Sequence, residues 1–290
     1  MAYRQYKPDE LRRLQLVTTG ILGEFDRICA ELKIDYFVYG GTAIGAVRHH
    51  GFVPWDDDVD VAMFREDYER FMRAAPKVMG GEYAIFSGRN TPHFPACNAN
   101  FSLRGTLCVP EEFDGCPFRY PIGIGVFALD RPASNPIRFA LQKRLAWLLA
   151  RLVFLRGTPR PHINVPSPLG GVISGICRLA YTAMKVLHVS PSLLHRLWEK
   201  TARMAENENT DVYVDFMDRN PFAWAVTRGE AYPPLRVPFE NITVSLPKEY
   251  DTLLTRGFGD YMQLPPKEQR KNHYPSRLDF GGYGAPAAGE

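Results

Sequence analysis

One stretch of this chain, residues 39–61, constrains the fold more than any other; it reads YGGTAIGAVRHHGFVPWDDDVDV. The apolar run just before it predicts a short buried strand. Gly40 and Gly41 follow, where the missing side chains allow a ligand to come close. Thr42 is the predicted N-cap of a short helix that ends near Arg48. A strand, a glycine turn and a helix N-terminus together predict a phosphate-binding site.

The same stretch ends in carboxylates at Asp56, Asp57, Asp58 and Asp60. We expect residues 58–63 to form a strand, in which Asp58 and Asp60 share one face. Two like charges about 7 Å apart along a strand repel each other, and a cation between them removes that cost. One or two carboxylates with substrate phosphates are usual ligands of Mg²⁺. We therefore predict that Asp58 and Asp60 bind Mg²⁺ or Mn²⁺; the alternative is a solvated acidic turn.

Residues 39–71 resemble the signature of the LicD family, which includes the fukutin-related transferases. The resemblance implies an α+β fold: a nucleotidyltransferase-like mixed sheet flanked by helices. It implies that Gly40, Gly41 and Thr42 receive the phosphates of a nucleotide-linked donor. The implied reaction is transfer of a phospho-alcohol, typically phosphocholine from CDP-choline, onto a sugar of a surface glycan, such as lipopolysaccharide or teichoic acid, or onto its lipid-linked precursor. A nucleotidyltransferase that releases pyrophosphate is the alternative.

Other residues of the stretch have two interpretations each. Arg48 either clamps negative charge on the leaving group or forms a salt bridge with a nearby acid. Asp56 or Asp57 is the expected base for the acceptor hydroxyl. Trp55 either packs against a choline-like quaternary ammonium or anchors the turn from within, and we favour the anchor.

A strand expected over residues 121–130 departs from the family pattern. Relatives generally carry the third acid of the metal site at the position of Gly125, where this chain has no side chain. Asp130 lies five residues on, and an odd separation directs it to the opposite face unless a bulge intervenes. Three interpretations stay open. Asp56 or Asp57 supplies the oxygen, metal binding is weaker, or the protein is a catalytically impaired relative that binds glycan or nucleotide.

Charged residues are distributed unevenly along the chain. Residues 131–198 hold ten Lys or Arg and no Asp or Glu, so that the rest carries −7 against a net charge of +3 for the whole. Helices are expected at 137–155 and 169–189, and basic residues interrupt both before the roughly 18 uncharged residues of a spanning helix. Basic apolar helices suit the surface of an anionic membrane. The alternative is a packed layer with a solvated basic face. No nucleic-acid-binding motif accompanies the charge.

We therefore divide the chain into three parts. Residues 1–130 form a nucleotidyltransferase-like core with the metal and phosphate site, residues 131–198 a basic, mainly helical insertion, and residues 199–290 complete the core. The five cysteines, odd in number and without a Cys-x-x-Cys pair, indicate a reducing compartment. No apolar signal core opens the chain. We expect a cytoplasmic protein, or one peripheral at the inner face of a membrane.

Overall fold

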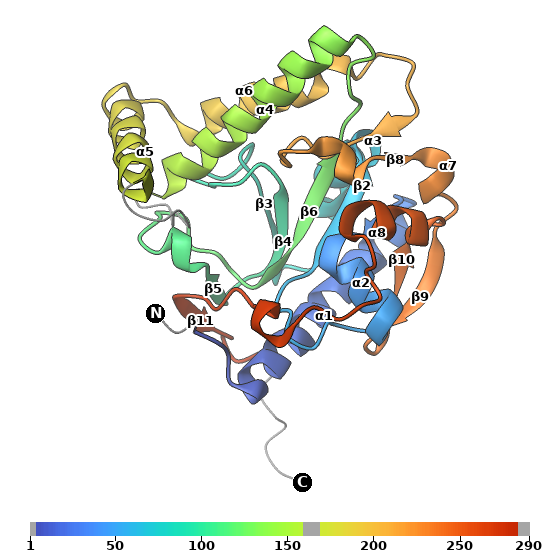
Figure 1. Cartoon of the computed structure of the whole chain (residues 1–290). Helices are drawn as coiled ribbons and strands as arrows, with labels where there is room; N and C mark the ends of the chain where they lie inside the picture. The colour runs from blue at the N-terminus through green and yellow to red at the C-terminus, as the bar shows by residue number, and fades with distance from the viewer. Residues whose placement is uncertain (1–3, 159–168, 284–290) are drawn as a thin grey trace.

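The computed structural model describes residues 4–158 and 169–283. Its centre is a mixed sheet in the order β1-β2-β6-β4-β3, with β2 and β6 parallel and the other neighbours antiparallel (Figure 1). The strands are β1 (Phe37–Val38), β2 (Asp60–Phe64), β3 (Tyr83–Phe86), β4 (Ala99–Leu103) and β6 (Gly123–Leu129). With helices packed on it, this sheet confirms the predicted α+β class.

One face of the sheet packs on the main core. Alternation along the strands places Val61 and Val126 on this face. Helices α1 (Pro8–Leu32) and α3 (Arg65–Ala74) cover it. Phe25 of α1 is fully buried there. Because α1 has apolar residues at helical spacing, it presents one continuous stripe to the sheet.

The opposite face is divided between a second core and a polar end. Phe37 and Phe64 pack there against Tyr213, which comes from the C-terminal third of the chain. Asp60 has the same parity as Phe64 along β2, and so it lies on this side. The position of the acid outside the main core follows directly from the alternation of the strand.

The basic segment forms three helices, α4 (Pro136–Gly157), α5 (Leu169–Val186) and α6 (Pro191–Ala202). Helices α4 and α6 lie side by side, and α5 is set apart at one edge of the molecule (Figure 1). Val153 and Trp198 share a separate core with Phe216. The insertion is therefore mainly helical, as predicted, and packs on a core of its own.

The remaining elements bring the end of the chain back onto its beginning. Strand β10 packs on α1 and β1, and β11 pairs with β5. These elements are α2 (Gly40–His49), β5 (Leu107–Val109), β7 (Val212–Tyr213), β8 (Val226–Thr227), α7 (Arg228–Ala231), β9 (Leu235–Phe239), β10 (Ile242–Leu246), α8 (Tyr250–Phe258) and β11 (Arg277–Asp279).

Candidate active site

The glycine turn lies between β1 and α2. Helix α2 begins at Gly40, so the prediction that Thr42 caps it is wrong; the N-cap is Tyr39, without a side-chain hydrogen bond. Gly40 has a φ of +55°, the left-handed conformation that favours glycine. A Cβ at Gly41 would lie 2.9 Å from Oδ2 of Asp56. A side chain is therefore disfavoured at both positions. At Gly40 the left-handed backbone opposes it, and at Gly41 the neighbouring Asp56 carboxylate does.

Thr42 connects this turn to the acidic strand. Its hydroxyl oxygen accepts a hydrogen bond from the backbone N–H of Asp60 at 2.9 Å. The first N–H groups of a helix have no partner within the helix and carry a partial positive charge. The hydrogen bond thus holds Asp60 beside the N-terminal end of α2.

The acids line one cavity although the strand begins later than predicted. We predicted a strand over residues 58–63, but β2 starts at Asp60. Asp58 therefore lies before the strand. Asp58 and Asp60 nevertheless border the same cavity, of about 280 Å³. Its polar lining includes Asp57, Asp58, Asp60, Asn98, Asn100 and His273.

A row of residues across three strands forms the floor of this cavity. Asp60 of β2 pairs with Gly125 of β6, and Gly125 pairs with Asn100 of β4. Directly opposed residues share a face of the sheet. A Cβ built at Gly125 would overlap the carboxylate of Asp60 and come within 2.8 Å of the Phe127 ring. The Asp60 carboxylate therefore occupies the space that a third acid at Gly125 would need.

Asp57 forms hydrogen bonds with residues from both terminal parts of the chain. The hydroxyl of Tyr6 donates to one of its oxygens at 2.9 Å, and the backbone N–H of His273 donates to the other at 2.9 Å. The Asp57 side chain is only 5% exposed. Because both oxygens are engaged, this residue has a structural role in the site.

The remaining acids repel one another. Burial raises the pKa of Asp60 well above its usual range, and the charges of Asp58, Asp56 and Asp215 add to the rise. Burial, followed by the charges of Asp58 and Asp57, also raises the pKa of Asp56. Across the described residues, no Arg or Lys forms a salt bridge with Asp56, Asp58 or Asp60. Within the described chain, neither arginine nor lysine therefore balances the negative charge of this site.

His273 is the cationic side chain at its rim. Its Nδ1 lies 3.3 Å from Asp57 and 3.6 Å from Asp58. The hydrogen bond to Asp57 is the main cause that raises the pKa of His273 to about 9. The imidazole is therefore charged at neutral pH and offsets part of the negative charge.

Two predicted site residues lie elsewhere. Arg48 is in the last turn of α2 and donates to the carbonyl oxygen of Tyr261 at 2.7 Å. It forms no salt bridge with the acids in the part of the chain that the structure describes, so that alternative is not realised. Trp55 is partly buried against the main core, with the guanidinium of Arg270 4.8 Å above its ring. This contact fits the anchoring role of Trp55.

Asp130 also lies away from the site. Strand β6 runs in unbroken register with β2, so no bulge changes its parity. The Asp130 carboxylate, 1% exposed, binds the guanidinium of Arg65 at 2.6 Å. It therefore cannot serve as the third acid of the cavity.

Three further residues lie near the acids: Asp215, His273 and Asn100. Asp215 is 6% exposed, and its Oδ1 accepts from the backbone N–H of Met217 at 2.7 Å. Neither Asp215 nor His273 belongs to a local pattern, because tertiary packing alone brings them here. Asn100 could have been found, since Asn98 and Asn100 alternate with Ala99 and Phe101, a pattern that predicts a strand.

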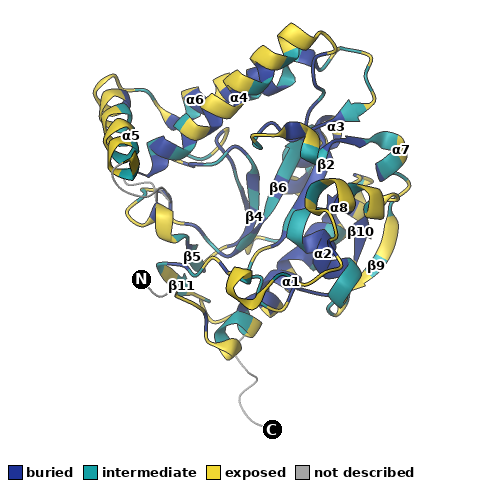
Figure 2. Cartoon of the chain, viewed as in Figure 1, coloured by how far each residue is buried: buried dark blue, intermediate teal, exposed yellow. Residues whose placement is uncertain are grey.

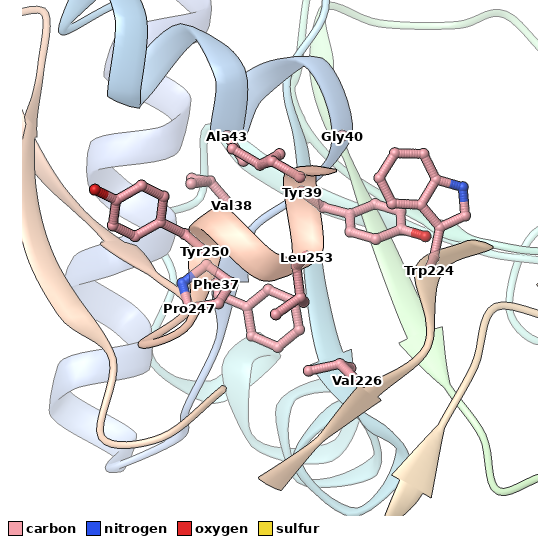
Figure 3. A pocket seen from close by; sticks show the side chains of 11 residues that line it. Phe37, Val38, Tyr39, Gly40, Ala43, Trp224, Val226, Pro247, Tyr250 and Leu253 are labelled. Carbon is pink, nitrogen blue, oxygen red and sulfur yellow. The ribbon is translucent and has the colours of Figure 1, made fainter. Parts of the chain in front are cut away.

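An apolar pocket adjoins the glycine turn (Figure 3). Phe37, Tyr39 and Trp224 present aromatic rings to it, and Gly40 forms part of its wall. The Tyr39 and Trp224 rings lie 5.2 Å apart, edge to face. No carboxylate lines this pocket. It therefore differs in chemistry from the acidic cavity.

The donor chemistry of the cavity fits a hard divalent cation. Asp58 and Asp60 offer oxygen ligands, and a cation would relieve their repulsion. Among the described residues, no group of three or more His, Cys, Asp or Glu is arranged to hold a metal. Because Mg²⁺ often takes one or two protein carboxylates and completes its shell with water and substrate phosphates, two acids suffice. Such an ion would depend on a bound nucleotide.

Comparisons with known proteins bear on this site. Residues 33–92 match the family described as LicD/FKTN/FKRP, nucleotidyltransferase domain. The chain is 26% identical over 283 residues to the lipopolysaccharide cholinephosphotransferase LicD of Haemophilus influenzae, an alignment that covers 91% of this chain and 96% of that protein. An uncharacterized protein of Rickettsia typhi is 31% identical over 82 residues, 28% of this chain and 26% of that protein. An uncharacterized protein of Rickettsia prowazekii is 41% identical over 45 residues, 16% of this chain and 17% of that protein. The predicted resemblance to the LicD family is confirmed.

Proposed function

We propose, from the LicD-type nucleotidyltransferase domain that this chain carries over residues 33–92, that the protein transfers phosphocholine from a CDP-linked donor to a sugar of lipopolysaccharide or a similar surface glycan. The hydrogen bond from Asp60 to Thr42 carries the proposal, because it holds an acidic strand beside a helix N-terminus. All five cysteines are free, which supports action on the cytoplasmic side of a membrane.

The acids and the glycine turn have separate roles in this reaction. Asp58 and Asp60 would hold a Mg²⁺ ion, which when bound neutralises charge on the diphosphate. The N–H groups of Gly40 and Gly41 receive phosphate oxygens. The acceptor hydroxyl attacks the phosphorus that bears choline, the P–O bond to CMP breaks, and the hydroxyl proton passes to Asp56. A raised pKa suits Asp56 to that task.

We assign the choline group to the apolar pocket beside the turn, whose cavity of about 20 Å³ must widen to admit it. Quaternary ammonium groups bind the faces of aromatic rings. Tyr39 and Trp224 offer such rings next to Gly40, whereas the face of Trp55 is taken by Arg270. Replacement Trp224→Leu should weaken binding of CDP-choline at least tenfold and leave binding of CMP unchanged, as measured by calorimetry. Equal weakening of both ligands would remove this assignment.

Gly125 favours a second candidate, a relative that binds nucleotide or glycan without turnover. The chain lacks an acid there, although Asp60 fills the space. The decisive experiment incubates the protein with CDP-choline, Mg²⁺ and a lipooligosaccharide acceptor, and follows CMP, pyrophosphate and product mass. CMP release with a phosphocholine mass gain supports the proposal, and pyrophosphate release indicates nucleotidyl transfer. Nucleotide binding without either product favours the non-catalytic relative.

Matched variants make this experiment specific. Asp58→Asn should abolish CMP release, because it removes the negative charge of a proposed metal ligand from the cavity. Asp211→Asn, an exposed acid outside the cavity, should leave the rate unchanged. Loss of activity in both variants would show that the acids of the cavity have no special role.

A further inference from the structure

Exposed apolar side chains gather on the helical insertion. Of the twenty large apolar side chains that are exposed among the described residues, thirteen lie between residues 137 and 197. Figure 2 shows exposed residues along α5 and the outer side of α4. Single exposed apolar residues are ordinary, but a concentration on one part of a protein marks an interaction surface.

Helix α5 carries the clearest part of this surface. Its apolar residues recur every three or four positions along one stripe, at Leu169, Val172, Ile176, Leu179, Ala183 and Val186. Leu179 is 71% exposed, and Val172, Ile176 and Val186 are each more than half exposed. The opposite side of the helix, with Met184 buried, packs on the helical core. The helix therefore has two apolar sides and only one of them is covered.

Basic side chains without carboxylate partners are exposed on the same three helices. Arg178 and Lys185, seven residues apart, flank it on α5, and Arg144, Arg151 and Arg196 are exposed on α4 and α6. In residues 4–158 and 169–283, none of these five forms a salt bridge with an acid. By contrast Arg138, at the start of α4, binds Glu208 at 2.8 Å. The acid-free composition of the segment thus leaves positive charge facing solvent.

We propose that this surface of α4, α5 and α6 binds an anionic lipid bilayer, with the α5 stripe in the headgroup region. An apolar stripe bordered by arginine and lysine is the pattern of helices that lie in a membrane interface. No single described helix is long and apolar enough to cross a membrane, although α5 together with residues 191–205, bent by 107°, meets the criteria of length and composition as a pair. The proposal does not depend on the transferase reaction.

Vesicle flotation of the full chain tests this surface without any activity assay. The wild type should float with vesicles of phosphatidylcholine and phosphatidylglycerol, and the bound fraction should fall as salt rises. Ile176→Glu with Leu179→Glu should lower partitioning at least tenfold, and Arg178→Gln with Lys185→Gln about tenfold at low salt. Leu16→Glu with Leu235→Glu, two exposed apolar residues elsewhere, is the matched control and should float like the wild type.

Three outcomes would overturn the proposal. The first is no flotation with anionic vesicles at low salt. The second is equal flotation of the Ile176→Glu, Leu179→Glu variant and the wild type, with circular dichroism showing both folded. The third is concentration-dependent dimerisation that this variant abolishes while vesicles bind neither protein, which would assign the stripe to a second copy of the chain.

Discussion

Two groups of acids in this molecule have opposite surroundings. Around Arg65, which is 6% exposed, Asp130 lies at 2.6 Å, Glu199 at 3.2 Å and Glu69 at 3.4 Å. At the acidic site, Asp56, Asp58 and Asp60 have no arginine or lysine partner within the described chain, and His273 lies 3.6 Å from Asp58. The first group is compensated by an arginine, and the second is not.

Under the proposed function, the difference separates structural acids from acids that act on the substrate. Crowded carboxylates repel one another at a cost in free energy, and a bound cation would remove that cost. The glycine turn next to Asp60 supplies a place for such a ligand. The comparison therefore predicts that removing an acid lowers stability in the Arg65 group and lowers activity in the cavity.

The largest expected effect is on stability, at Asp130. Replacement Asp130→Ala leaves the Arg65 guanidinium buried without its main partner and should lower the free energy of unfolding by about 3–5 kcal/mol in urea denaturation. The double replacement Arg65→Met with Asp130→Leu should recover most of that loss. A loss below about 1 kcal/mol for the single variant would contradict the structural role.

The next effect is on activity, at Asp60. Asp60→Asn should lower kcat for CMP release by about 10²–10³-fold, the size typical of a lost electrostatic group in an active site. Its melting temperature should not fall, since repulsion among the acids is relieved. A variant that melts well below the wild type would place Asp60 with the structural acids.

Gly125 tests the same comparison by adding an acid. Gly125→Asp requires the Asp60 carboxylate to move, because the new Cβ overlaps it. If that carboxylate rotates toward the cation site, the variant should bind Mg²⁺ more tightly and turn over about tenfold faster, as a stronger electrostatic site predicts. Gly125→Ala has the same overlap without the charge and is the control. An equal rate in the wild type and Gly125→Asp would show that this position does not limit turnover.

The smallest expected effect is a dependence of stability on pH. Asp56 and Asp60 keep their protons to a higher pH in the folded chain than in the unfolded chain, since burial raises their pKa values, that of Asp56 to about 8. Unfolding then releases protons between about pH 4 and pH 8, so the free energy of unfolding falls as pH rises through that range. With EDTA present, the wild type should melt lower at pH 8 than at pH 6, and Asp60→Asn should show a smaller difference. Identical differences in both would contradict the assignment.

Much of this architecture could be predicted from the sequence. Strand β3 lies at residues 83–86, as its apolar run predicts, and α1 ends at Leu32 as its periodicity predicts. Gly40, Gly41 and the acids were also recognisable, because a turn and a charge cluster are local patterns. The start of β2 was placed two residues early, since alternation cannot tell an extended lead-in from a hydrogen-bonded strand.

The rest depended on contacts between distant segments. Thr42 was predicted as a cap from its position after the glycines, yet its hydroxyl serves Asp60 instead. His273 reaches the cavity from 216 residues beyond Asp57, and no local pattern marks such a neighbour. Arg48 lies away from the acids because it is in the last turn of α2, one helix length from the glycine turn.

The two hydrogen bonds to Asp57 have a practical meaning for handling this protein. Tyr6 and His273 reach the same carboxylate from opposite extremities of the polypeptide. A protease that trimmed either extremity past these residues would leave one Asp57 oxygen without its hydrogen bond, at the edge of the acidic cavity, without cutting any central element.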